Sequence, residues 1–338
     1  MMNEINDAFD RLLGLTFPSE TVRGIETGNT DWRPVWDEIE QSGFLDLLVP
    51  EAAGGAGIAW ADSGALFALL GRHAVPAPIA ETMVARLFLA QAGVAAPAGP
   101  ILIVTRAEAR PVQLFAVPFG RVAGAVLLVS ADGAALVSLD GAGITPALLP
   151  GSLAADIAFV ANAGETLIFA PGLTLDTAAQ ALAVLRAHAI AGAAARLLDM
   201  TLGYAADRNQ FGKPIGRQQA VQQQLAVMAE KVVMARMAAD MGSRGAFPPS
   251  LAAAATAKQV ASTAGADICA IAHAVHGAIG ISEEYDLQLF TRRIHEWRLE
   301  ADGATHWAQA LGRVRLQQSD MSTLDFVRSA EDTGTVSA

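Results

Sequence analysis

The chain has 338 residues, which is enough for two or three domains and for a sizeable hydrophobic core. Hydrophobic residues make up 52% of the chain and charged residues 17%, a balance that excludes an intrinsically disordered protein. Acidic residues number 34 against 23 basic ones, and the net charge is −11. Most of the surface would therefore repel a phosphate backbone, so we expect no nucleic-acid partner.

Cysteine and histidine are scarce. Cys269 is the single cysteine, which excludes an internal disulfide, and with six histidines we expect no metal site. This usage favours a cytoplasmic protein, and the acidic residues 1–11 do not form a secretory signal. Residues 87–105 carry no charge, but Gly93 and Pro97 would break a helix there, so we expect no membrane span.

The first 95 residues are predicted to form an all-helical lobe. Asp31 stands at an N-cap position, Pro34 lies in the first turn, and apolar residues follow at helical spacing until Gly43. Proline and glycine predict irregular backbone over residues 47–58. Two further helices are expected over residues 60–72 and 79–92.

Residues 96–172 have a different pattern. Short β-branched and aliphatic runs are separated by Gly, Pro and Asp, which predicts a small and mostly antiparallel β domain. These runs cover residues 101–105, 112–117, 125–130, 134–139 and 166–170.

The chain is helical again over residues 173–320, where four long helices predict a bundle. The helices are expected over residues 176–207, 217–242, 250–275 and 284–297. Residues 321–338 are rich in Ser, Thr, Asp and Gly and are expected to be a loose tail. Helices, then strands, then a helical bundle predict an α+β chain with separate lobes.

Common catalytic motifs do not occur in the sequence. It has no HExxH, no GxSxG and no GxxxxGK[ST] motif, which argues against zinc-protease, serine-hydrolase and P-loop NTPase chemistry. Gly277 and Gly280 do not follow a predicted strand and lack GxGxxG spacing, so a Rossmann fold has no support.

Two segments carry the most informative pattern. Residues 204–230 contain R-x-x-F-G-x-x-I-x-x-x-Q, and residues 275–293 contain a glycine-bearing turn between two helices. Together with residues 36–57, which read WDEIEQSGFLDLLVPEAAGGAG, they resemble the acyl-CoA dehydrogenase family. The family signature has the same arginine, phenylalanine, glycine and glutamine spacing on one helical hairpin, and Q-x-x-G-G-x-G on another.

The resemblance implies an acyl-CoA dehydrogenase-like architecture: an N-terminal helical lobe, a small central β domain and a C-terminal four-helix bundle. It also implies FAD as cofactor and oxidation of an acyl-CoA, from fatty acid or steroid side-chain catabolism, to a trans-2-enoyl-CoA. An electron-transfer flavoprotein is the expected acceptor. The implied assembly is a tetramer, either of this chain alone or with a longer homologue.

Arg208 and Phe211 each have two interpretations. From the residues alone, Arg208 caps the carbonyls at a helix end and Phe211 fills a core. The resemblance instead implies that Arg208 binds the FAD pyrophosphate of a neighbouring subunit and that Phe211 packs on the flavin nucleotide.

The glutamine-rich run that follows has a similar ambiguity. A solvated helix face is the simpler interpretation of its polar residues. By resemblance, Gln219 lies near the adenosine half of FAD, with Gln210, Ile215 and Gln218 as its neighbours.

The turn at Gly277 and Ala278 is, from the residues alone, a helix C-cap, since glycine tolerates positive φ. The resemblance implies that its backbone approaches the ADP moiety. The family motif has glutamine where this chain has Ala274 and glycine where it has Ala278, so a looser contact is expected.

The expected reaction needs a base for the α-proton while hydride leaves Cβ for the flavin, and a desolvated carboxylate suits this role. The family supplies Glu in a Y-E-G-T-like loop. Aligning on Gly303 places Asp302 there, one methylene shorter, with Glu300 as the second choice. From the residues alone, Asp302 and Gly303 form an ordinary turn. The position that carries the base in other members falls near Leu182 and Ala183.

The central domain departs most from the family pattern. Its T-E-P-x-A-G-S-D loop and W-x-x-N strand, which hold the flavin ring and acyl-CoA, are missing from residues 95–172. An alternative function follows: a catalytically incomplete partner subunit that supplies ADP-side contacts to FAD in a mixed acyl-CoA dehydrogenase tetramer.

Overall fold

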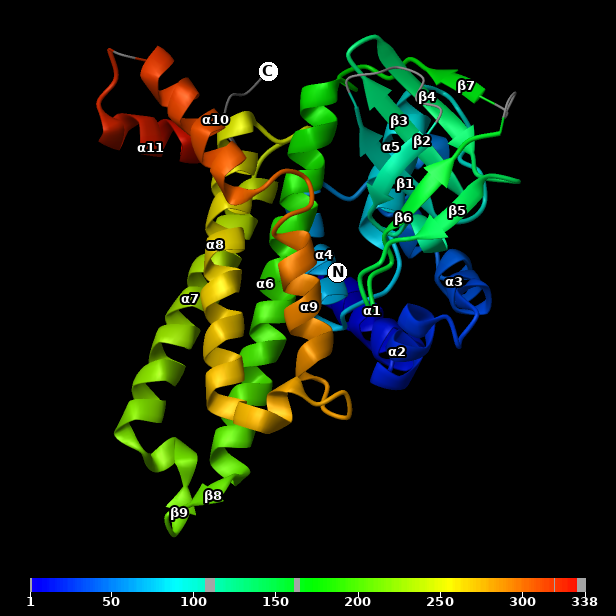
Figure 1. Ribbon diagram of the computed structural model, residues 1–338. Helices are drawn as coiled ribbons and strands as arrows, with labels where there is room; N and C mark the ends of the chain where they lie inside the picture. The colour runs from blue at the N-terminus through cyan, green and yellow to red at the C-terminus, as the bar shows by residue number, and fades with distance from the viewer. Residues whose placement is uncertain (1, 107–112, 161–164, 319, 333–338) are drawn as a thin grey trace. The chain divides into compact units, whose positions relative to one another are not determined.

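A computed structural model describes residues 2–106, 113–160, 165–318 and 320–332 (Figure 1). The chain divides into two compact parts. The first part comprises residues 1–63 and 75–182, and the second part comprises residues 64–74 and 183–338. Helix α4 (Trp60–Arg72) runs from the first part into the second. The N-terminal helices and the strands between residues 101 and 168 therefore share one part, and the boundaries predicted at residues 95 and 172 remain predictions.

Two helices of the first part, α3 and α5, begin where the sequence predicts, and α1 and α2 were not predicted individually. Asp31 caps α3, and its side chain accepts a hydrogen bond from Arg33 N. Helix α5 is buried from Ile79 to Leu89, which explains its almost continuous apolar sequence. The helices are α1 (Met2–Thr16), α2 (Ser19–Thr27), α3 (Trp32–Gln41) and α5 (Ile79–Gln91), with 3₁₀ turns η1 (Phe44–Asp46) and η2 (Glu51–Ala53).

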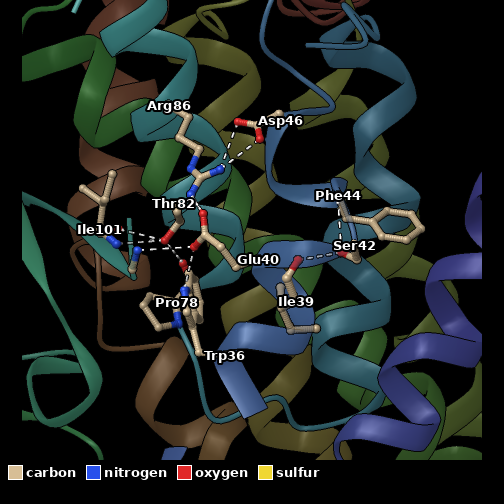
Figure 2. Close-up of polar contacts among 11 residues, drawn as sticks. Trp36, Ile39, Glu40, Ser42, Phe44, Asp46, Pro78, Thr82, Arg86 and Ile101 are labelled. Carbon is tan, nitrogen blue, oxygen red and sulfur yellow. Dashed lines mark hydrogen bonds and ion pairs between the residues drawn. The ribbon is translucent and has the colours of Figure 1, made fainter. Parts of the chain in front are cut away.

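Arg86 joins three segments of the first part (Figure 2). Its side chain is 7% exposed, and its guanidinium lies between the carboxylates of Glu40 and Asp46. Glu40 also accepts hydrogen bonds from Trp36 Nε1 at 2.8 Å and Gly99 N at 3.3 Å. This network fixes α5 against α3 and η1, because a buried guanidinium needs its partners in place.

The described strands of the first part form two small sheets. One has the order β1-β3-β4-β7, with β1 and β3 parallel and the other pairs antiparallel; the second is antiparallel with the order β2-β6-β5. The strands are β1 (Ile101–Thr105), β2 (Gln113–Val117), β3 (Ala125–Ser130), β4 (Gly133–Ser138), β5 (Gly143–Pro146), β6 (Ala155–Ala158) and β7 (Glu165–Ile168). The five expected runs contain β1, β2 and β3 and overlap β4 and β7, each of which begins one residue earlier than expected. Strands β5 and β6 are additional, since β5 is exposed throughout and neither shows a long apolar run.

Helix α8 lies at the centre of the bundle in the second part and packs against α7, α9 and α10. A Cβ at Gly242 in α7 would come within 2.6 Å of Ala257 Cβ in α8, so small residues permit this close packing. The helices are α6 (Leu175–Asp207), α7 (Gln219–Ser243), α8 (Leu251–His276), α9 (Leu287–Trp297), α10 (Ala304–Gln317) and α11 (Thr323–Asp332). Helix α10 was not predicted individually.

The expectation of a loose tail is wrong over α11. Ser322 Oγ accepts a hydrogen bond from Asp325 N at 3.1 Å and donates to Asp325 Oδ2 at 2.6 Å, which caps the helix. Phe326 is buried, with the Arg315 guanidinium over its ring. A polar composition concealed a short amphipathic helix.

Two described helical segments, Leu175–Asp207 and Leu251–Ile281, are long and apolar enough to cross a membrane by length and composition alone. The apolar window of Leu175–Asp207 is 83% buried inside the protein, which is typical of a core helix.

Candidate cofactor-binding site

A short hairpin extends from the end of α6 (Figure 1). Strands β8 (Asn209–Gln210) and β9 (Lys213–Pro214) pair with each other, and Ile215 N donates to Arg208 O at 2.8 Å to close the hairpin. Its two-residue tip has φ of +54° at Phe211 and +77° at Gly212. Positive φ at both positions matches hairpin twist, but it is uncommon for a phenylalanine.

The side chains of this hairpin face solvent. The Phe211 residue is 90% exposed, and Arg208 and Gln210 are also exposed. The interpretation of Phe211 as a core residue is therefore wrong. A strained backbone that presents an aromatic ring to solvent is typical of a binding element.

Ile215, which follows the hairpin, anchors it to the bundle. Ile215 begins the 3₁₀ turn η4 (Ile215–Arg217) and is half-buried against a cluster of Ala205, Leu225 and Val275. The sequence placed Ile215 beside a cofactor, whereas its described contacts are with this cluster.

Gln218 and Gln219 follow at the start of α7. Gln218 is its N-cap residue and its backbone N–H donates to Ile215 O at 2.9 Å. Gln219, the first residue of α7, is exposed. It thus lies on the solvent side of the same bundle end as the hairpin.

The predicted glycine turn ends α8. Gly277 has φ +62° and ψ −138°, and its N–H donates to His273 O. No heavy atom lies within 4 Å of the position that a Cβ would take, so the conformation rather than space requires glycine. Gly277 and Ala278 are both exposed and begin the 3₁₀ turn η5 (Gly277–Ile281).

An aromatic contact brings the hairpin and the glycine turn together. The Tyr204 ring stacks on the His276 ring with centroids 4.5 Å apart, and Tyr285 lies 5.3 Å from His276. Arg208 is one turn after Tyr204, and its N–H donates to Tyr204 O. The residues from the two informative segments therefore lie at one end of the bundle. Sequence analysis did not single out Tyr204 or His276, although each stands near a motif residue.

Burial lowers the pKa of His276, and the hydrogen bond of its Nδ1 to Ala272 O at 2.8 Å opposes that effect. Burial therefore favours the neutral form of the ring that stacks on Tyr204.

The residues present fit the ADP end of FAD. They offer an exposed guanidinium for a diphosphate, an exposed aromatic ring, and an open glycine backbone beside them. The described residues contain no group of three or more His, Cys, Asp or Glu side chains that could hold a metal ion.

The two candidate bases lie at the other end of α9, an 11-residue helix of about 16 Å. Asp302 has φ +64° and its side chain is 55% exposed, with Oδ2 3.9 Å from His306 Nε2. Glu300 is engaged by Arg186 in an ion pair whose two side chains are largely buried. Asp302 is thus the accessible carboxylate of the two, and Gly303, which follows it, is the extended N-cap residue of α10.

The family model of the acyl-CoA dehydrogenase C-terminal domain matches residues 175–303 of the sequence. This span includes the hairpin, the glycine turn and Asp302. The acyl-CoA dehydrogenase IpdE2 of Mycolicibacterium smegmatis is 33% identical over 256 residues, covering 76% of this chain and 79% of that protein. The chain belongs to the acyl-CoA dehydrogenase family.

A second curated relative supports this membership, and a solved structure supports the fold. IpdE2 of Mycobacterium tuberculosis is 32% identical over 273 residues, covering 76% of this chain and 78% of that protein. The ChsE4–ChsE5 complex of Mycobacterium tuberculosis superposes with a TM-score of 0.80 at 22% identity, covering 94% of this chain and 97% of that one. The predicted family and the α+β fold class are confirmed, and the chain is an oxidoreductase of this family.

Proposed function

We propose that this acyl-CoA dehydrogenase uses FAD to convert an acyl-CoA thioester to a trans-2-enoyl-CoA. One observation carries the proposal. Arg208, Phe211 and Gly277 lie at one exposed end of the bundle, where the stacked rings of Tyr204 and His276 link their segments. FAD, when bound, supplies the hydride acceptor of the reaction.

The chain's own residues have separate roles. Arg208 pairs with the diphosphate, because a guanidinium offers two parallel donors to phosphate oxygens. Phe211 covers an apolar face of the nucleotide, and the exposed backbone at Gly277 and Ala278 allows close approach. Gln219, with Gln210 and Gln218, offers hydrogen bonds to the adenosine half. Because all these groups except the half-buried Gln218 are exposed, we propose that they serve a neighbouring subunit of a tetramer.

Asp302 is the proposed base that accepts the α-proton at its carboxylate. Its exposed side chain must lose water when acyl-CoA binds, since desolvation brings a carboxylate pKa towards that of the proton it removes. Glu300 is less suited because Arg186 already engages it.

A second candidate function rests on a specific observation. The side chain of Asp302 is 55% exposed rather than enclosed in an apolar pocket. The central domain also lacks the family's flavin-ring motifs. On this alternative the chain completes the FAD site of a longer, catalytic homologue in a mixed tetramer. The ChsE4–ChsE5 structure, a complex of two named components, has a similar fold.

Substrate and partners follow from the relatives. The relatives are named acyl-CoA dehydrogenases, and one solved neighbour is described as a steroid ACAD variant. We propose an acyl-CoA from fatty acid or steroid side-chain catabolism as the substrate. An electron-transfer flavoprotein is the proposed acceptor, and the cytoplasm is the proposed location.

The test is to purify the chain alone and after co-expression with a longer homologue, and to add acyl-CoA anaerobically. Enzyme function predicts a yellow protein that the substrate bleaches. A colourless chain that gains flavin only with the homologue supports the partner function, and no flavin in either preparation contradicts both. Asp302→Asn is the matched variant, because asparagine has nearly the same size and tolerates the positive φ of +64° at this position. Loss of bleaching with flavin retained supports the base, whereas normal bleaching removes Asp302 from the mechanism.

A further inference from the structure

The turn that carries Asp302 has an unusual backbone. Ala301 and Asp302 both lie in the left-handed region, with φ of +51° and +64°. Residues other than glycine rarely adopt this conformation, and two in succession persist only where the surrounding structure holds them. The contacts around the turn show what holds them.

Lys258 of α8 holds the end of α9 from the interior of the bundle. Its Nζ donates to Trp297 O at 2.7 Å and to Ser262 Oγ at 3.2 Å, and the residue is 0% exposed. A cation at the last carbonyls of a helix is favourably placed, because the helix dipole is negative there. Lys258 therefore fixes the point from which the turn departs.

The next tethers are an ion pair and an indole. Arg186 of α6 engages the carboxylate of Glu300, which directly precedes the turn. Trp307 of α10, which is buried, donates from Nε1 to Ala301 O at 2.7 Å. Three helices thus hold residues 297, 300 and 301, immediately before Asp302.

The charges around Lys258 are mixed. Burial lowers its pKa to about 7, Glu300 and Asp302 raise it, and Arg186 and Arg298 lower it. Burial thus opposes the charged form, while the hydrogen bonds to Trp297 O and Ser262 Oγ hold the amine in place.

We propose that Lys258, Arg186 and Trp307 are positioning residues that hold the turn in one conformation and so present Asp302 to the acyl substrate. This inference rests on the proposed base role of Asp302. None of the three need touch the substrate, since each acts through the backbone or through Glu300.

The test compares Lys258→Met and Trp307→Phe with two matched controls in the flavin-loaded oligomer. Lys231→Met removes a lysine that pairs with Asp267 elsewhere in the bundle, and Trp36→Phe removes an indole that donates to Glu40. The measurements are amide hydrogen exchange over residues 299–305, substrate affinity, and the rate of anaerobic flavin reduction in a single turnover.

We expect faster exchange over residues 299–305 in both test variants, with the reduction rate down about tenfold or more and substrate affinity within about twofold. The controls should match the wild type. Unchanged exchange, or faster exchange with a normal reduction rate, overturns the positioning role. Trp307→Phe removes one donor while keeping an aromatic ring, so it decides the matter if Lys258→Met fails to fold.

Asp302→Asn separates the proposed base role of Asp302 from the proposed positioning role of its neighbours. Normal reduction in Asp302→Asn overturns the base role and the positioning role together. Slow reduction in Asp302→Asn with normal reduction in Lys258→Met and Trp307→Phe overturns the positioning role alone.

Discussion

The ring of Tyr204 stacks on the ring of His276, with centroids 4.5 Å and planes 25° apart. Tyr204 stands one turn before Arg208, and His276 directly precedes Gly277. The contact therefore couples the hairpin at the end of α6 to the turn at the end of α8. It provides the structural link between two segments that are about 70 residues apart in the chain.

A double-mutant cycle measures this coupling. For Tyr204→Ala, His276→Ala and the double variant, we expect an interaction free energy of about 1 kcal/mol, the usual size for a stacked pair. Urea unfolding of the four proteins gives the value. Strictly additive effects would show that the two rings do not support each other.

Replacing Phe211 should weaken flavin binding while leaving the stability of the fold almost unchanged. The side chain is exposed, so Phe211→Ala should change the free energy of unfolding by less than about 0.5 kcal/mol and yet weaken flavin retention. Leu316→Ala is the control, because Leu316 is 80% exposed on α10. Urea unfolding and flavin content after gel filtration are the measurements. Equal flavin content in the two variants would exclude a role for Phe211 in binding.

His188 should make the fold sensitive to acid. Burial lowers its pKa from 6.5 to about 4, and its Nε2 lies 3.0 Å from Ser243 Oγ. Between these two values the unfolded chain binds the proton and the folded chain does not, so stability falls as the pH drops from 6.5 to 4. The loss from this group is roughly 3 kcal/mol.

His188→Gln should not show this loss of stability in acid, whereas His306→Gln, at an exposed site, should still show it. Urea unfolding at pH 7 and pH 4.5 compares the two variants. The same acid loss in both would remove His188 as its source.

Arg86 should contribute strongly to the stability of the first part of the chain. Arg86→Met leaves the carboxylates of Glu40 and Asp46 without their buried partner, and we expect a loss of about 3 kcal/mol. Arg33→Met is the control, since the Arg33–Asp31 pair is exposed and should contribute less than about 1 kcal/mol. Urea unfolding measures both, and similar losses would contradict the network's importance.

Local signals in the sequence predict much of this fold. Asp31 predicts the start of α3 because a carboxylate at the N-cap can accept from the first backbone amides of a helix, and it does so. The equivalent signal at Ser322 and Asp325 starts α11, but it was obscured by the polar composition of the tail. Strand β5 could not be predicted because all four of its residues are exposed and show no alternation.

The candidate site was predictable in its parts but not in its arrangement. The motif spacing pointed to Arg208, Phe211 and Gly277, yet the sequence could not show that the Phe211 ring faces solvent at a strained hairpin tip. The Tyr204–His276 stack is a long-range contact without a local signal. The tethers of Lys258, Arg186 and Trp307 on the Asp302 turn are equally non-local.

The flavin content of the purified oligomer carrying Arg208→Ala tests the central claim most directly. Loss of charge-assisted bonds to a diphosphate should weaken FAD retention by about 2–3 kcal/mol, with Arg208→Lys intermediate and the exposed Arg313→Ala like the wild type. Wild-type flavin content in Arg208→Ala would contradict the account, because the hairpin arginine would then hold no part of the cofactor.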